Sequence, residues 1–139
     1  MKNSKEEILA ATRELFKNTL METLEIEIID FTHDTVTARM PVSPKVHQPD
    51  GVLHGGASVA LAETLGSFAA VHFMRTENVS IRGIEISANH VKSVKDGFVY
   101  ATATVIHKGK TTQLWQIKIV NEDDDLVSLV KLTTIALKL

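Results

Sequence analysis

The sequence predicts an α+β fold in which an antiparallel sheet wraps around one long central helix. One long apolar segment without strand-like alternation, residues 55–73, predicts that helix. Six shorter segments alternate between apolar and polar residues and are separated by turn residues, which is typical of strands joined as hairpins. A lone apolar helix needs a cover on most sides, and a curled sheet supplies it. With 139 residues, the chain is long enough for one domain with a core and too short for two, so we expect a single domain over residues 1–139.

The N-terminus predicts a short amphipathic helix over residues 4–18. Ser4, followed three positions later by Glu7, is the pattern of a capping box. We expect residues 1–20 to lie at the periphery of the domain. Their mixture of acids and bases lacks the apolar core and cleavage site of a signal peptide.

The remaining elements follow from alternation and turn residues. Prolines 41, 44 and 49 predict an irregular loop between the first two strands and the long helix. The connections between the later strands are short and rich in glycine, lysine or aspartate, so consecutive strands are expected to pair. The predicted strands cover residues 24–30, 35–42, 80–91, 98–107, 113–120 and 127–138.

Composition and charge exclude several classes of function. A net charge of −2 gives no reason to expect a nucleic-acid partner. The chain has no cysteine, and its six histidines show no zinc spacing, so we expect no metal and no cofactor. The acidic run at 123–125 lacks the glycine and glutamate of a calcium loop and predicts a hairpin turn. Because 55–73 carries a glutamate and small polar residues, it predicts a core helix rather than a membrane span, and a cytoplasmic protein.

Two features of the long helix point to chemistry. An unpartnered buried charge costs several kcal/mol or more, so Glu63 in this apolar segment needs a reason. Either it is inert and faces a groove or a subunit contact, or it is a general base or nucleophile that lines a pocket. The pair Gly55 and Gly56 marks either a tight turn or helix-terminal N–H groups that polarise a carbonyl.

The spacing of these two features predicts an assembly. Gly55 and Glu63 are eight residues apart, which is about 12 Å along a helix. One carbonyl group cannot contact both residues within one chain. If both serve one active site, the carboxylate comes from one subunit and the glycine N–H from the other. The spacing therefore predicts a dimer with two shared sites and with the two long helices near each other and antiparallel.

The motif around these residues resembles a known family. The segment QPDGVLHGGA at 48–57, followed by AETLGS at 62–67, resembles the signature of hotdog-fold acyl-CoA thioesterases. The branch that it most resembles includes the 1,4-dihydroxy-2-naphthoyl-CoA, enterobactin-proofreading and phenylacetate-pathway thioesterases. The segment GIEISANH at 83–90 resembles the next strand of that family, and the order of elements agrees over nearly the whole chain.

The resemblance implies a hotdog fold that pairs into a dimer, and then into a tetramer built from two dimers. It implies an acyl-CoA substrate, or an acyl carrier protein, and water as co-substrate. The Gly55 N–H would bind the thioester carbonyl, and Glu63 of the partner chain would attack it or activate water. The other implied roles are Gln48 and His54 in positioning the carbonyl or completing the loop, Gly56 beside them, Ser67 in positioning water or the acyl group, Phe68 at the acyl pocket, His90 near the substrate, and Lys92 and Lys110 on the nucleotide phosphates.

Two other classes of function use the same fold. One is a non-catalytic acyl-CoA-binding protein, and the other is a hydratase or dehydratase acting on acyl thioesters. The sequence leaves open the acyl group, the carrier, the arrangement of the tetramer, and the choice between attack by Glu63 and attack by activated water.

Overall fold

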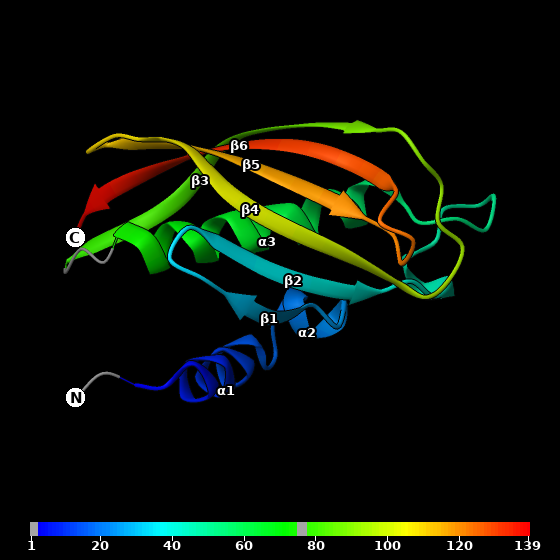
Figure 1. Cartoon of the computed structure of the whole chain (residues 1–139), viewed down its shortest axis with the longest axis horizontal. Coiled ribbons are helices and arrows are strands. Elements are labelled where there is room, and N and C mark those ends of the chain that lie inside the picture. Colours follow the sequence, from blue (N-terminus) through cyan, green and yellow to red (C-terminus); the bar gives the residue numbers. More distant parts are fainter. Residues whose placement is uncertain (1–2, 75–77) are drawn as a thin grey trace.

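A computed structural model of the chain describes residues 3–74 and 78–139. Six antiparallel strands form one curved sheet in the order β1-β2-β4-β5-β6-β3, and the long helix α3 lies across its inner face (Figure 1). The helices α1 and α2 lie outside the sheet beside β1 (Figure 1). The elements are α1 (Lys5–Phe16), α2 (Leu20–Thr23), β1 (Glu27–Phe31), β2 (Thr35–Pro41), a short 3₁₀ turn (Pro44–Val46), α3 (Gly55–Met74), β3 (Val79–His90), β4 (Phe98–Lys108), β5 (Thr112–Val120) and β6 (Leu126–Lys138).

The predicted fold class is confirmed, with two differences near the N-terminus. The helix α2 is a single turn that the sequence pattern did not indicate, and β1 begins at Glu27, three residues later than predicted. Asn18 and Glu25 take left-handed conformations, with φ of 61° and 57°, on either side of that turn. A left-handed residue ends a helix or strand locally but leaves no trace in the hydrophobic periodicity, so the sequence pattern did not indicate these boundaries.

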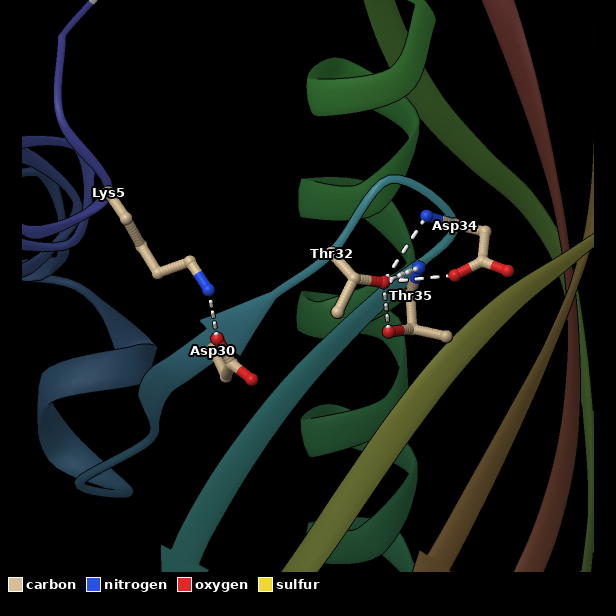
Figure 2. Close-up of polar contacts among 5 residues, drawn as sticks. All are labelled: Lys5, Asp30, Thr32, Asp34 and Thr35. Atoms are coloured by element: carbon tan, nitrogen blue, oxygen red, sulfur yellow. Dashed lines mark hydrogen bonds and ion pairs between the residues drawn. The ribbon is translucent and has the colours of Figure 1, made fainter.

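The helix α1 begins as predicted and is held against β1 by charge. The Glu7 N–H donates to Ser4 Oγ at 3.2 Å, and the Ser4 N–H donates to the Glu7 carboxylate at 3.4 Å, which completes the capping box. Lys5 Nζ reaches back to Asp30 Oδ1 on β1 at 2.7 Å (Figure 2). This hydrogen bond, reinforced by the lysine charge, holds the pKa of Asp30 below its ordinary value. Because both side chains are half-exposed, the pair orients α1 more than it stabilises the fold.

The predicted turn between β1 and β2 is closed by hydroxyl groups. The Thr32 side chain accepts hydrogen bonds from the Asp34 and Thr35 N–H groups, at 3.3 and 3.1 Å. Its hydroxyl also lies 2.9 Å from the Asp34 carboxylate and 2.7 Å from the Thr35 hydroxyl (Figure 2). These local bonds satisfy the turn backbone and fix the register of the first hairpin.

Small side chains let α3 approach the sheet closely. Ala62, Gly66, Ala69 and Ala70 are all buried, and α3 contacts every strand from β2 to β6. A Cβ atom at Gly66 would lie only 2.5 Å from Leu132 Cδ2. Among the described residues, α3 is the one helix whose length and hydropathy would allow it to cross a membrane. Here it is the core helix of the sheet.

The strand β3 forms a free edge of the sheet and carries a bulge. Among the strands of the described residues it pairs with β6 alone, and its register shifts between Gly83 and Glu85. Gly83 lies opposite Thr134, and His90 lies opposite Ser128, two positions whose side chains are buried. The extra residue in the bulge therefore turns Gly83 and His90 toward the same face, the one covered by α3, although seven positions separate them.

The close contact at Gly66 generates a stability prediction. Alanine is favoured over glycine in a helix by about 1 kcal/mol, whereas forcing a methyl group into a packed core costs about 1–3 kcal/mol. We expect the overpacking to prevail in Gly66→Ala and to lower the free energy of unfolding by about 1–2 kcal/mol, measured by urea denaturation at fixed protein concentration.

Thr64→Ala is the matched control, because Thr64 lies on the open face of the same helix and is only half-buried. We expect it to change stability by less than about 0.5 kcal/mol. A Gly66→Ala variant more stable than the wild type would contradict the packing described.

Candidate active site

The loop before α3 is ordered by its own backbone. The Gln48 N–H donates to Val52 O at 2.8 Å, and the Gly51 N–H donates to Gln48 O at 3.0 Å. Gly51 takes a φ of +78°, which glycine adopts without strain. The Gln48 side chain accepts a hydrogen bond from the Asp50 N–H, so its amide is held by the loop that it belongs to. This ordered loop fixes the position at which α3 begins.

His54 caps the helix with its ring. The Gly56 N–H donates to His54 Nδ1 at 2.7 Å, and the N–H groups of Ala57 and Ser58 are bonded to the His54 carbonyl. Because Nδ1 accepts, the proton of the neutral ring is on Nε2. Among the described residues, the Gly55 N–H has no acceptor. One N–H at the positive end of a 20-residue helix is thus left for a ligand, while Gly56 already has a partner.

A cavity of about 340 Å³ opens beside this N–H group. The His90 ring lies at its wall, where its Nε2 would be 2.8 Å from a Cβ atom on Gly55. On its other side, His90 Nδ1 is 2.7 Å from the hydroxyl of Ser128, which is fully buried. Four of the predicted site residues therefore line one cavity. They are Gln48, Gly55, His90 and Lys92. Ser58 and Ser128, which were not among the predicted site residues, also line it.

Glu63 lines a second, larger hollow on the outer face of α3. Its volume is about 630 Å³, and apolar side chains of α1, α2 and α3 form most of its wall. The Glu63 carboxylate lies against the edge strand, where Oε2 would be 3.3 Å from a Cβ atom on Gly83. Within the two described ranges it makes no hydrogen bond or ion pair. The predicted site residues on this hollow are Gly56, Glu63, Ser67 and Phe68.

The predicted site residues thus fall into two groups within one chain. The first group, which contains the residues predicted to bind the carbonyl, surrounds the start of α3, and the second group, which contains Glu63, lies about two turns further along the helix. His54 supports the first group as a cap. Lys110 lies in the β4–β5 turn, near Thr112 and its pairing partner Ile135, at the far end of β6 from Ser128. It joins neither group in one chain.

Lys92 is engaged by an acidic neighbour at the rim of the first cavity. Its Nζ donates to Asp125 Oδ2 at 2.9 Å, and this bond, with a second from Asn121, lowers the pKa of Asp125. The acidic turn is closed by Asn121, whose Oδ1 accepts from the Asp125 N–H at 2.9 Å. Across residues 3–74 and 78–139, no group of three or more His, Asp or Glu side chains is arranged to hold a metal ion.

Two residues beside these groups were not identified from the sequence. Gly83 leaves room for the Glu63 carboxylate, and Ser128 bonds the His90 ring. The signal for Ser128 is a serine in an otherwise apolar stretch of β6, but its partner is 38 residues away and depends on the register of β3 on β6. The signal for Gly83 is a glycine inside a strand pattern, which suggests a bulge or a close approach.

Comparison with known proteins assigns this arrangement to a family. Residues 50–128, which contain every residue of the two groups except Gln48, match the model of the thioesterase superfamily. The chain belongs to the thioesterase superfamily.

Relatives of this thioesterase cover nearly its whole length. A protein of Vibrio cholerae, named as a candidate esterase, is 49% identical over 91% of this chain and 82% of its own. The 1,4-dihydroxy-2-naphthoyl-CoA hydrolase of Listeria monocytogenes is 44% identical over 86% of this chain and 95% of its own. A solved thioesterase of Haemophilus influenzae is 40% identical, with a TM-score of 0.91 over 99% of this chain and 93% of its own. The predicted family, the hotdog fold and the thioester hydrolase class are confirmed.

The Lys92–Asp125 pair generates a pH prediction. An NMR titration should place the carboxyl pKa of Asp125 below its ordinary value near 3.8 in the wild type. It should move upward in Lys92→Met, because the principal donor is lost. A lowered folded-state pKa contributes stability above the unfolded value, about 3.9, and that contribution is lost as the pH falls through the folded value. Lys95→Met, in the same loop, is the control that leaves the titration unchanged; an unshifted Lys92→Met would refute the pairing.

Proposed function

We propose that this thioesterase hydrolyses an aromatic or medium-chain acyl-CoA, or the corresponding acyl carrier protein thioester, to the free acid and the thiol. The observation that carries the proposal is a carboxylate in a largely apolar hollow, on the same helix as an N–H group, neither of which has a hydrogen-bonding partner among the described residues. A relative of similar length that is named as an acyl-CoA hydrolase supports CoA as the carrier. An acyl-CoA substrate also agrees with the predicted cytoplasmic location.

The free edge of the sheet supports a dimer that shares its sites. Both halves of the site lie along β3, with Glu63 beside Gly83 and Gly55 beside His90. A long unpaired edge strand is a template for a second copy. Antiparallel pairing of two β3 strands about a two-fold axis near Ile86 would bring position 83 of one chain close to position 90 of the other. The carboxylate of each chain would then face the Gly55 N–H of its partner.

In this arrangement, the Gly55 N–H of one chain donates to the thioester carbonyl oxygen. The helix dipole adds to this donor as negative charge develops on that oxygen. Glu63 of the other chain either attacks the carbonyl carbon or takes a proton from the attacking water. Collapse of the tetrahedral intermediate breaks the C–S bond and releases the thiol after protonation. If water attacked, this step gives the acid directly; if Glu63 attacked, it gives an acyl–Glu63 anhydride, which water then hydrolyses to the free acid and the Glu63 carboxylate.

The other residues take supporting roles in the proposal. Gln48 lines the cavity of about 340 Å³ beside the Gly55 N–H, which we call the carbonyl cavity. His54 caps the helix start that presents the Gly55 N–H. Ser67 is one helical turn beyond Glu63, so it can position water or the acyl group. Phe68 borders the hollow that would take the acyl group. Lys92, at the cavity rim, and Lys110, through the assembled oligomer, would meet the CoA phosphates, and a dimer of dimers remains the predicted assembly.

The first test of this function is thiol release from a panel of acyl-CoAs. The panel would contain benzoyl-, hydroxyphenylacetyl-, dihydroxynaphthoyl- and C4 to C12 acyl-CoA, each assayed with the wild type and Glu63→Gln. We expect wild-type turnover on at least one aryl or medium-chain ester, and a fall in kcat of about 10³-fold or more in the variant, because the carboxylate takes part in the chemical step.

Circular dichroism and the oligomeric state of Glu63→Gln should match those of the wild type. Turnover that survives the substitution would remove Glu63 from the mechanism. A wild type that hydrolyses no ester of the panel would overturn the proposed substrate class.

The second test asks whether each site uses two chains. Gly55→Pro removes the N–H group at the first helical position, where proline is tolerated. Co-expression of Gly55→Pro and Glu63→Gln under two tags, followed by tandem purification, yields mixed dimers. Each mixed dimer holds one intact shared site of two, so we expect about half of the wild-type turnover per dimer.

Either variant alone should be almost inactive. Gly55→Ala is the matched control for the proline, because it adds the Cβ atom near His90 but keeps the N–H group. Mixed dimers with no more activity than their parents would show that the sites are not shared.

A further inference from the structure

Ser128 is a hydroxyl group built into the core beside the carbonyl cavity. It is fully buried on β6, directly opposite His90 on β3. In the described part of the chain, His90 Nδ1 is the one hydrogen-bonding partner of its hydroxyl, at 2.7 Å. Ser128 touches the site only through this ring and the cavity wall.

The position of the hydroxyl proton follows from burial. A buried O–H that donates to nothing pays the cost of its lost hydration. Among the described residues His90 Nδ1 is the acceptor within reach, 2.7 Å away, and a Ser128 O–H that donates to it requires an Nδ1 without a proton in the neutral ring. This hydrogen-bond direction puts the ring proton on Nε2, the nitrogen that lies beside Gly55. His54 reaches the same tautomer by a different route, because its Nδ1 accepts from a backbone N–H.

With this tautomer, two donors belong to residues that line the same cavity. One is the Gly55 N–H at the start of α3, and the other is the Nε2–H of His90 from the edge strand. A carbonyl oxygen that becomes negative in the transition state is best stabilised by donors fixed in advance. An imidazole that is free to exchange tautomers would offer a bare acceptor to that oxygen for part of the time.

We propose that Ser128 is a positioning residue that holds His90 as the Nε2–H tautomer, and that this Nε2–H is the second donor to the thioester carbonyl beside the Gly55 N–H. The proposal rests on the function proposed above. It goes beyond that function by giving His90 a defined proton and a defined atom to contact, and by explaining why a polar side chain is buried at position 128.

The tautomer can be measured without any substrate. Nitrogen-15 NMR of the labelled wild-type protein at pH 8, with His90 assigned through His90→Gln, distinguishes a protonated ring nitrogen from a bare one. We expect a protonated Nε2 and a bare Nδ1 in the wild type, and shifts averaged between the two tautomers in Ser128→Ala. A wild-type ring protonated on Nδ1, or a Ser128→Ala spectrum identical to the wild type, would overturn the proposal.

The catalytic consequence is measured on the best ester of the panel. Losing a whole oxyanion donor costs about 10²–10³-fold in kcat, so loosening one that remains present should cost about 10-fold to 100-fold. We expect this fall in kcat in Ser128→Ala with KM changed by less than about threefold, since the donor acts mainly on the transition state. Ser128→Thr keeps the hydroxyl and should restore most of the rate.

Thr12→Ala is the control for loss of a buried hydroxyl, because Thr12 bonds Ile8 O in α1 and lines neither the carbonyl cavity nor the hollow of Glu63. It should keep the wild-type kcat and the His90 shifts. Unchanged kcat in Ser128→Ala beside an active wild type would reject the role of Ser128 and leave the thioesterase proposal standing. An inactive wild type would reject the thioesterase proposal and leave the NMR result to decide the tautomer.

Discussion

The close approach of α3 to the sheet is the constraint on which the rest of the molecule depends. A helix with small residues on its inner face can lie nearer to the strands than one with leucines throughout, and Gly66 against Leu132 marks the closest point. This approach brings the helix start against the His90 ring and the middle of the helix against Gly83. A helix held further out would separate the Gly55 N–H from His90 and would leave the Glu63 carboxylate away from the edge strand.

The bulge in β3 is the second constraint, and it works together with the first. Side chains alternate along a strand, so positions 83 and 90 would face opposite sides of an unbroken strand. The single extra residue, Ile84, restores both to the face that α3 covers, and it leaves its own side chain 55% exposed at the free edge. One strand can therefore contact both sets of site residues, the set around the start of α3 and the set around Glu63. A one-residue slip of β3 on β6 would also separate His90 from Ser128.

The sequence was sufficient for the fold because its strongest signals are local. The apolar 55–73 segment, the alternating strands and the capping box at Ser4 and Glu7 each depend on neighbours within a few residues. The single-turn helix α2 was missed because four residues carry no period, and its limits are set by the backbone at Asn18 and Glu25. The rise of a helix per residue was also sufficient to predict that Gly55 and Glu63 of one chain lie too far apart to contact the same carbonyl group.

The parts of the site that escaped prediction depend on register. No local pattern indicates that His90 lies opposite Ser128, because that pairing follows from the bulge and from the path of β6 across the sheet. The same holds for Gly83, whose missing side chain matters only because a carboxylate of α3 lies against it. Lys92 and Lys110 looked equivalent in sequence, as cations in neighbouring connections. The hairpin geometry places them at opposite ends of the sheet, so they cannot serve the same cavity within one chain.

The polar groups of the site differ in whether they already have a hydrogen-bonding partner within the chain. Most polar groups around the start of α3 have protein partners, including the Gly56 N–H, the His54 ring and the Ser128 hydroxyl. Within residues 3–74 and 78–139, the Gly55 N–H and the Glu63 carboxylate have no such partner, and one is a donor while the other is an acceptor. In the proposed mechanism, a bound thioester would engage both at once, because its carbonyl oxygen would accept from the amide while its carbonyl carbon, or the water beside it, would meet the carboxylate. The two groups without a partner among the described residues are therefore the ones that a substrate held between two chains would use.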